Sequence, residues 1–332
     1  MSKNFQVQLA SFPKSIPRPN DFKLIETPIP DLSLDQVLCE TLYLSLDPYM
    51  RSQIAGRHMS GSVGVNEPMI GETVSRVVMS ESKDFKPGDI VRCFGGWQHY
   101  SAHNASALQM VADTIDPMSY ALSILGMPGL TAYAGIIWQA EPKPGDVVVI
   151  PAAIGGVGAT AGQLAKLKGC VVVGIAGSEE KCQYATEELS YDACINRKTE
   201  NVSDRLKELC PHGINVFFDL VGGELLQTAS EQLAIGARVI LCGLMSEYNN
   251  STRAAGPAPG LWIKARAIIY GLVVYDFEHR REEFLKNCIP YVKSGELKIR
   301  EDITMGLETA PESFCRLMQG DNFGKALVRV GT

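Results

Sequence analysis

A glycine-rich segment carries the first pattern with chemical meaning. The stretch "VVVIPAAIGGVGATAGQLAK" places Ala152, Gly155 and Gly158 in an A-x-x-G-x-x-G spacing. Small residues here let the backbone turn sharply out of a strand and bring N–H groups close to a pyrophosphate at a helix N-terminus. An apolar strand precedes the pattern and an amphipathic helix follows it, in which Gly162 is expected to let the helix press against the strand. The segment therefore predicts a dinucleotide site, and the alternative is a packing turn that binds no nucleotide.

The end of the next predicted strand carries the second pattern. An acid at this position normally binds the ribose hydroxyls of NAD, but "VVVGIAGSEEKC" has Gly177 and Ser178 there. Lys181 follows in the first turn of the next helix, and Arg197 comes just after the third strand, with Lys198 next to it. The guanidinium of Arg binds phosphate through two parallel N–H donors, the ammonium of Lys binds it as a point charge, and the Ser hydroxyl can add a hydrogen bond. The pattern predicts NADPH, unless these are ordinary solvated charges.

Composition narrows the class of protein. The chain has 332 residues, is 45% hydrophobic and carries a net charge of -6, so we expect about two domains. It contains no block of Lys and Arg, which argues against nucleic acid or an anionic membrane as partner. The nine cysteines are scattered without metal-ligand spacing and predict reduced thiols in the cytoplasm. We expect no signal peptide and no membrane span.

The order of patterns along the chain predicts an α/β fold. Residues 1–124 show short strand-like runs punctuated by Pro and Gly, which indicates a β-rich domain. Residues 125–295 alternate strands with helical periodicity, which predicts a parallel sheet covered on both faces. Residues 296–332 suggest strand, helix and strand returning to the first domain. The strands predicted in the middle region are Val147–Ile150, Val171–Ile175, Ala193–Asn196, Val216–Leu220, Arg238–Cys242 and Ala267–Val274, with helices at Gly158–Leu167 and Lys181–Leu189. The run 266–277 around the last strand is apolar at nearly every position, so both faces of that strand are expected to be buried.

Five ordered segments resemble a known family. They are "LYLSLDPYMR", "LGMPGLTAY", "FFDLVGGE", "CGLMSEYN" and "DNFGKALVRV". Together they resemble the zinc-independent medium-chain dehydrogenase/reductases, in the branch of prostaglandin reductase, plant double-bond reductases and bacterial curcumin reductase. The resemblance implies a doubly wound Rossmann sheet inserted in a GroES-like, β-rich catalytic domain, and a homodimer. It also implies NADPH-dependent reduction of the C=C bond in α,β-unsaturated ketones and aldehydes.

The resemblance also implies which residues contact the cofactor. Two positions depart from the family pattern, because members usually have Tyr in place of Arg197 and Asn in place of Leu220. The first departure keeps a phosphate partner, and the second removes a side-chain hydrogen bond. The residues predicted to bind the cofactor are Gly155, Gly156, Val157, Gly158, Ala159, Ser178, Lys181, Arg197, Cys242, Gly243, Leu244, Met245, Ser246, Tyr248, Leu272, Val273, Val274 and Asn322.

We expect no metal. The segments "LSLDPYMR" and "IGETVSRVV", where zinc alcohol dehydrogenases place ligands, lack Cys and His. The five histidines stand alone, without ligand spacing. Without zinc no Lewis acid polarises an alcohol at neutral pH, which argues against simple alcohol oxidation and favours a conjugated acceptor.

Reduction of a conjugated carbonyl needs a hydrogen-bond donor for the enolate and a proton source. Tyr248 is the first candidate because it follows a strand C-terminus, and Tyr49 is the second; each could instead be a buried aromatic. Arg51 is expected to be structural, and Thr131 to touch the nicotinamide amide. Residues 249–260 are expected either to cover the substrate or to form an idle surface loop. The alternative functions are NADPH:quinone oxidoreduction and NADPH binding without turnover.

Overall fold

The computed structural model describes residues 3–250 and 255–331. Positions 251–254 of the segment 249–260, for which a substrate cover and an idle surface loop were both expected, lie outside the described residues. The described residues form two compact units. One contains the residues up to Ser123 together with those from Glu301 onward, and the other is Ile124–Arg300. The second unit extends to Arg300 because Gln163 and the backbone of Lys298 exchange two hydrogen bonds, of 2.7 and 2.8 Å.

The second unit is built on a six-stranded parallel sheet. Its order is β10-β9-β8-β11-β12-β13, with every neighbouring pair parallel. The order reverses between β8 and β11, as in doubly wound dinucleotide-binding folds. This arrangement confirms the predicted Rossmann-type α/β class. The strands are β8 (Val147–Pro151), β9 (Val171–Ala176), β10 (Ala193–Asn196), β11 (Ile214–Asp219), β12 (Leu233–Leu241) and β13 (Ile268–Gly271).

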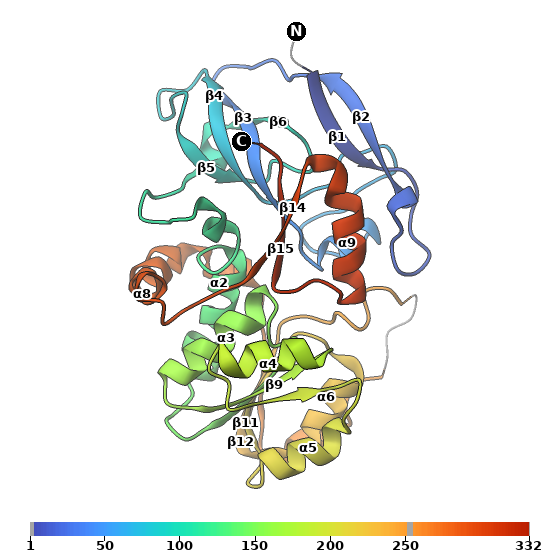
Figure 1. Ribbon diagram of the computed structural model, residues 1–332, viewed down its shortest axis with the longest axis vertical. Coiled ribbons are helices and arrows are strands. Elements are labelled where there is room, and N and C mark those ends of the chain that lie inside the picture. The colour runs from blue at the N-terminus through green and yellow to red at the C-terminus, as the bar shows by residue number, and fades with distance from the viewer. Residues whose placement is uncertain (1–2, 251–254, 332) are drawn as a thin grey trace. The chain divides into compact units, whose positions relative to one another are not determined.

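Helices flank this sheet (Figure 1). A fully buried cluster that includes Val149, Val173, Ile195, Phe217 and Val239 forms the core on the strands, since continuous apolar runs suit strands that are covered on both faces. The helices are α2 (Met127–Tyr133) continuing into the π-helix η4 (Ala134–Ala140), α3 (Gly156–Leu167), α4 (Glu179–Glu187), α5 (Val202–Leu209), α6 (Gly223–Ser230), α7 (Pro259–Ala265), the 3-10 segment η5 (Val274–Arg280) and α8 (Arg281–Ser294).

Gly162 makes room for a side chain. We expected this glycine to let α3 approach the strand, but a Cβ there would lie 2.2 Å from the ring of Tyr191. Tyr191 is 3% exposed, and its hydroxyl donates to the carbonyl of Gly158 at 2.8 Å and lies 3.2 Å from the carbonyl of Ala153. The glycine therefore admits an aromatic ring that is bonded to the turn before α3.

The last strand differs from the prediction. The apolar run 266–277 was expected to be a strand buried on both faces, yet β13 ends at Gly271 and the chain continues into η5. Ile268 is 52% exposed, so burial on both faces is wrong for the single chain. Val274 lies in η5 rather than in the strand. One side of β13 pairs with β12, and the other is the edge of the sheet.

The first unit is rich in β structure, as the sequence indicated. A two-stranded sheet pairs β1 with β2, and a seven-stranded sheet has the order β14-β15-β3-β4-β5-β7, with β6 also pairing with β3. The C-terminal strands lie beside strands from the N-terminal half (Figure 1). The elements are β1 (Lys3–Leu9), β2 (Phe22–Pro28), β3 (Gln36–Ser45), α1 (Met50–Ile54), β4 (Thr73–Ser80), β5 (Ile90–Cys93), β6 (Tyr100–Asn104), β7 (Gln109–Met110), β14 (Glu301–Met305), α9 (Ala310–Gln319) and β15 (Lys325–Arg329).

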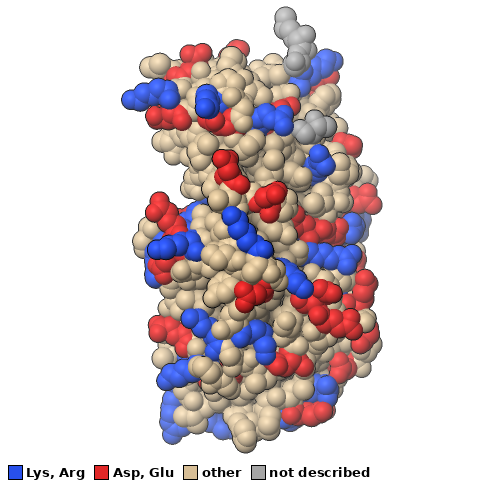
Figure 2. Space-filling view, turned by 60° about the vertical axis from the view of Figure 1, so that its left-hand side comes forward, with Lys and Arg blue, Asp and Glu red and all other residues tan. Residues whose placement is uncertain are grey.

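Acidic and basic side chains are interspersed on the face drawn in Figure 2. This mixture accords with the small net charge of -6. Within the described ranges, the structure contains no helix of the length and apolar character needed to cross a bilayer.

Candidate cofactor and active site

The candidate cofactor residues of the second unit follow the carboxyl ends of strands. Ala152 follows β8, Gly177 follows β9, Arg197 follows β10, Cys242 follows β12 and Leu272 follows β13. Because all six strands are parallel, these ends lie along one edge of the sheet. This is the edge at which open α/β sheets bind their ligands.

The turn between β8 and α3 has the features of a phosphate cradle. Ala152 takes a left-handed conformation, with φ of 53°, and its carbonyl accepts from the N–H of Gly155 at 2.9 Å. A Cβ on Gly158 would lie 2.3 Å from that carbonyl oxygen, so only glycine fits. Gly155, Gly156 and Val157 are partly exposed, whereas Ala159 is buried. The helix therefore presents its first N–H groups with little side-chain cover.

Two cationic side chains lie beside Gly177. A Cβ built on this glycine would lie 3.7 Å from Nη2 of Arg197 and 3.8 Å from Cε of Lys198. In the part of the chain that the structure describes, neither cation forms an ion pair with a carboxylate. Ser178 caps α4, because its Oγ accepts from the N–H of Lys181 at 3.4 Å. The Ser178 hydroxyl proton can therefore be donated to a phosphate oxygen. Lys198, which the prediction named only as a neighbour, thus joins Arg197.

The loop after β12 holds Tyr248 as a hydrogen-bond donor. The Tyr248 oxygen accepts from the N–H of Leu244 at 3.3 Å, and among the described residues no acceptor takes the Tyr248 hydroxyl proton. Burial raises the pKa of Tyr248, the N–H bond from Leu244 lowers it in part, and the charges of Asp219 and Glu247 add to the rise. The phenol is therefore protonated at neutral pH, and its proton is free for a ligand.

Asp219 closes the loops at the ends of β11 and β12. Its Oδ1 accepts from the N–H groups of Val221 and Gly222 at 3.0 and 2.8 Å. Its carbonyl accepts from the N–H groups of Cys242 and Gly243 at 3.0 and 3.1 Å. The residue is fully buried, and desolvation raises the pKa of its carboxyl to about 6. Sequence reasoning did not single out this acid; the signal was a charged residue that ends an apolar strand in "FFDLVGG".

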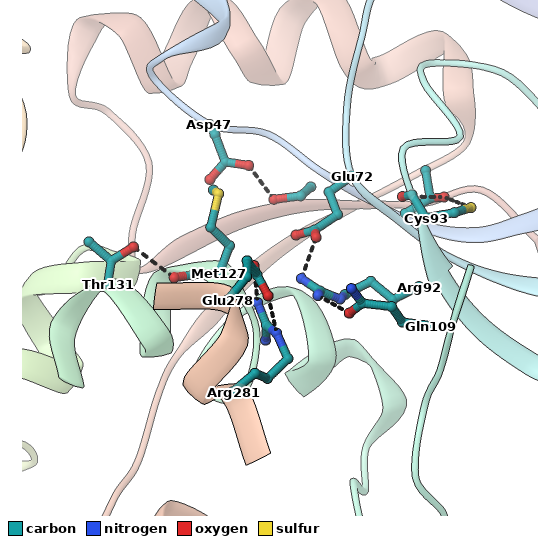
Figure 3. Close-up of polar contacts among 11 residues, drawn as sticks. Asp47, Glu72, Arg92, Cys93, Gln109, Met127, Thr131, Glu278 and Arg281 are labelled. Atoms are coloured by element: carbon teal, nitrogen blue, oxygen red, sulfur yellow. Dashed lines mark hydrogen bonds and ion pairs between the residues drawn. The ribbon is translucent and has the colours of Figure 1, made fainter. Parts of the chain in front are cut away.

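The remaining candidates of the second unit occupy the same edge. Leu272 is buried and its N–H donates to the carbonyl of Leu241 at 2.9 Å, while Val273 and Val274 are partly exposed. The contact expected between Thr131 and the nicotinamide amide stays a prediction, and the structure limits its direction. The Thr131 hydroxyl donates to the carbonyl of Met127, one turn back in α2, at 2.8 Å (Figure 3), so it can serve a ligand only as an acceptor.

The first unit holds Tyr49 and Asn322. The ring of Tyr49 stacks on His58, with 4.9 Å between ring centroids. The side-chain amide of Asn322 donates to the carbonyl of Gly324 at 2.7 Å. Arg51 is structural, as expected: it is 3% exposed and donates to the carbonyls of Pro13 and Ser15 at 3.1 and 3.0 Å. His58 was read from the sequence as an isolated histidine, and no sequence spacing links it to Tyr49.

Zinc alcohol dehydrogenases place metal ligands in the segments that here read "LSLDPYMR" and "IGETVSRVV". The acid of each segment is paired with a cation in this structure, so these residues do not fit a catalytic metal. Asp47 pairs with Lys325 at 2.7 Å, and both side chains are buried. Glu72 pairs with Arg92, which also contacts Gln109 (Figure 3). Within the described ranges, no group of three or more His, Cys, Asp or Glu side chains could hold a metal ion. We therefore derive no chemical step through a metal.

Family models match both units. Residues 6–111 match the N-terminal domain of oxidoreductase, and residues 156–289 match the zinc-binding dehydrogenase model. These matches and the sheet order define an oxidoreductase of the dehydrogenase type. The name of the second model refers to a metal that the residues of this chain do not fit, as shown by the ion pairs of Asp47 and Glu72.

Similar proteins show to which branch of the oxidoreductases the chain belongs. NADPH-dependent curcumin reductase of Escherichia coli is 41% identical, over 99% of this chain and 97% of its own length. The NADP(+)-dependent 2-alkenal reductase of Nicotiana tabacum is 36% identical, over 98% and 97%. The structure of CurA from Vibrio vulnificus in complex with NADPH superposes with a TM-score of 0.94 at 37% identity, over 99% of each chain. The chain therefore belongs to the zinc-independent medium-chain dehydrogenase/reductases, in the branch of the curcumin, prostaglandin and 2-alkenal reductases.

A more distant neighbour shares the fold alone. Escherichia coli quinone oxidoreductase complexed with NADPH superposes with a TM-score of 0.79 at 20% identity, over 98% of this chain and 99% of its own.

The raised pKa of Asp219 predicts a pH-dependent stability. Its carboxyl keeps a proton up to about pH 6 in the folded chain, against an ordinary pKa of 3.8. Between these values the folded state binds more protons than the unfolded state, so the free energy of unfolding falls as pH rises. We expect wild type to lose about 2–3 kcal/mol relative to Asp219→Asn across this window, and nothing further above it.

Urea denaturation at several pH values measures this difference. The exposed Asp204→Asn is the matched control, because it makes the same charge change where water screens it. A pH-independent difference between wild type and Asp219→Asn would contradict the prediction.

Proposed function

We propose that the protein reduces the C=C bond of α,β-unsaturated ketones and aldehydes with NADPH. The observation that carries this proposal is the state of Tyr248: its oxygen accepts from the Leu244 N–H, and its own proton has no acceptor among the described residues. A phenol held in this way donates to a carbonyl oxygen that gains negative charge during reduction. The relatives of the same branch are named as reductases that use NADPH or NADP(+).

The residues around Gly177 support NADPH as the cofactor. Arg197 and Lys198 lie where an acid at 177 would project, and a guanidinium binds a phosphate through a fork of N–H donors. Gly155, Gly156, Val157, Gly158 and Ala159 would hold the pyrophosphate at the start of α3. When bound, NADPH supplies a hydride. Lys181, Ser178 and the residues Cys242, Gly243, Leu244, Met245, Ser246, Leu272, Val273, Val274 and Asn322 are proposed as its further contacts.

Tyr248 has two roles in the proposed mechanism. Its hydroxyl donates a hydrogen bond to the substrate carbonyl oxygen, which stabilises the enolate that forms when the β-carbon is reduced. The same group or a water molecule then delivers the proton to the α-carbon. Because burial raises the pKa of Tyr248, the phenol retains its proton until the enolate develops. Tyr49 of the first unit is the second candidate for either role.

Initial rates of NADPH consumption with a panel of acceptors test the function. The panel contains a simple enone, an alkenal, a saturated ketone and a quinone, each with NADPH and with NADH. Turnover of the enone and alkenal alone supports the proposal. Semiquinone formation with the quinone would instead favour quinone oxidoreduction, and binding without turnover would favour a non-enzymatic NADPH-binding protein.

We propose further that two chains form a dimer through β13. Its outer side is the open edge of the sheet, and an unprotected edge pairs readily with another strand. Ile268 on this strand is 52% exposed and Ile263 on α7 is 76% exposed.

All nine cysteines are free thiols, which supports a reducing compartment such as the cytoplasm. The proposed partners are a small unsaturated carbonyl compound and a second copy of the chain, without nucleic acid or membrane.

Removal of the Arg197 guanidinium should weaken NADPH selectively. A hydrogen bond to a charged group contributes about 1.5–3 kcal/mol, so Arg197→Ala should raise the Kd for NADPH about ten- to a hundredfold. The Kd for NADH should hardly change. Gly177→Asp should act in the same direction, because its carboxylate would pair with Arg197 and repel the 2′-phosphate. Lys286→Ala removes an exposed cation on α8 and serves as the control; equal weakening of both cofactors by Arg197→Ala would refute the assignment.

Loss of the Tyr248 hydroxyl should slow the chemical step. General acid catalysis contributes about 10²–10⁴-fold, and since water can substitute in part, we expect Tyr248→Phe to lower kcat by about 10²-fold or less. NADPH affinity should stay near wild type, and kcat and kcat/KM should fall together. Steady-state kinetics on one soluble enone measure both, with Tyr49→Phe as the matched variant. An unchanged kcat in Tyr248→Phe would move the donor role to Tyr49 or to solvent.

Light scattering at micromolar protein should give twice the chain mass of 36.1 kDa. Ile268→Lys places a charge on the open edge and should yield monomers, since a buried unpaired charge opposes pairing. Ile235→Lys makes the same change at another exposed isoleucine, 66% exposed on β12, and should leave the dimer intact. A monomer mass for the wild type would exclude the dimer.

A further inference from the structure

Asp219 carries a buried charge whose two oxygens are used unequally. The residue has no exposed surface, and Oδ1 accepts both backbone N–H groups of the turn that follows β11. Within the described residues Oδ2 has no hydrogen-bond partner. A buried polar atom without a partner lowers stability. A residue that serves packing alone would not need this carboxylate.

Two chains of hydrogen bonds lead from Asp219 to the loop that contains Tyr248. In the first, Oδ1 fixes the turn that contains Val221, whose carbonyl accepts from Ser246 through both its N–H, at 3.0 Å, and its hydroxyl, at 2.7 Å. In the second, the Asp219 carbonyl fixes Cys242 and Gly243, and the next N–H, that of Leu244, donates to the Tyr248 oxygen. Both ends of the segment 242–246 are therefore anchored through one residue.

We propose that Asp219 is a positioning residue for Tyr248: its buried carboxylate holds the turn and the loop that orient the phenol, so that proton donation to the substrate depends on the ionised form of Asp219. The inference rests on the function proposed for Tyr248. Asp219 does not touch substrate or cofactor in this scheme, and it acts through the loop.

The groups that face Asp219 make this dependence fall in an accessible pH range. Glu247 and Tyr248 lie on the following loop, and Cys242 lies at the end of β12. Burial is the main cause that raises the pKa of Asp219 to about 6, and the charge of Glu247 adds to it, whereas the N–H groups of Val221 and Gly222 act in the opposite direction. No cation among these groups offsets the effect of burial. A protonated carboxyl accepts weaker hydrogen bonds than a carboxylate, so the turn loosens as the pH falls through this value.

A double-mutant cycle tests whether Asp219 acts through Tyr248. We expect Asp219→Asn to lower kcat for an enone at saturating NADPH by about ten- to a hundredfold, as misplacement of a catalytic group does. In a Tyr248→Phe background the same change should lower kcat by less than about twofold, because coupled residues are not additive. Asp204→Asn is the control, and thermal denaturation checks that each variant is folded. A full effect of Asp219→Asn in both backgrounds would overturn the proposal.

The pH profile gives a test that needs no substitution at Asp219. The ratio of wild-type kcat to Tyr248→Phe kcat should fall as pH is lowered through about 6, because only the wild type has a phenol to misplace. A constant ratio between pH 5 and 8 (about one unit or more on either side of that pKa) would overturn the inference. If Tyr248→Phe has wild-type kcat at every pH, the donor role proposed for Tyr248 has failed, and the inference falls with it. A slowed Tyr248→Phe with an additive cycle refutes the inference alone.

Discussion

The parallel direction of six strands is the constraint on which the candidate site depends. Because each strand of the second unit points the same way, every loop that leaves a carboxyl end emerges at the same edge of the sheet. Residues as distant in sequence as Gly158, Arg197 and Tyr248 are thereby brought to one side. Contacts between residues close in sequence would not bring these three together. If any of these strands ran antiparallel to the others, the loop after it would leave the sheet at the opposite edge.

Buried charges show where stability and function diverge in this protein. Lys325 and Asp47 neutralise each other inside the first unit at 2.7 Å, so neither is left as a lone charge. Among the residues that the structure describes, no cation pairs with Asp219, and burial raises the pKa of its carboxyl to about 6. At neutral pH the fold therefore carries a carboxylate that destabilises it. Positions that reduce stability in this way often serve a site.

Much of the fold followed from short-range patterns. The ends of β10 agree with the prediction residue for residue, and α3 begins two residues before the predicted start. The strand at 266–277 was overestimated, because an apolar run does not reveal where a chain leaves the sheet for a 3-10 turn. Gly162 was assigned the wrong neighbour, since its contact with Tyr191 spans 29 positions and leaves no trace in local spacing.

The residues of the candidate site also fall into those that the sequence predicts and those that only the structure reveals. Glycines and cations with fixed offsets from a strand, such as Gly155 and Lys181, can be found from the sequence because the βαβ unit sets their position. The partners of Asp219 and Asp47, and the stacking of His58 on Tyr49, depend on contacts between separate loops. Lys198 lies beside a predicted residue and was noticed, but only the structure directs its stem at Gly177.

The bond from Tyr191 to the turn before α3 has a consequence for how a nucleotide would bind. The phenol bonds the carbonyl of Ala153 in the turn and that of Gly158 in the first turn of α3, and the carbonyl of Ala152 accepts from Gly155, so these oxygens are engaged on the protein side. An incoming anion meets N–H groups that are already arrayed, and the loop has little conformational entropy left to lose. Preorganisation of this kind improves affinity by reducing the ordering that binding requires. Discrimination between nucleotides is thereby left to the adenosine end of the cofactor. There the side chains of Arg197 and Lys198 beside Gly177 are exposed and can adopt several rotamers.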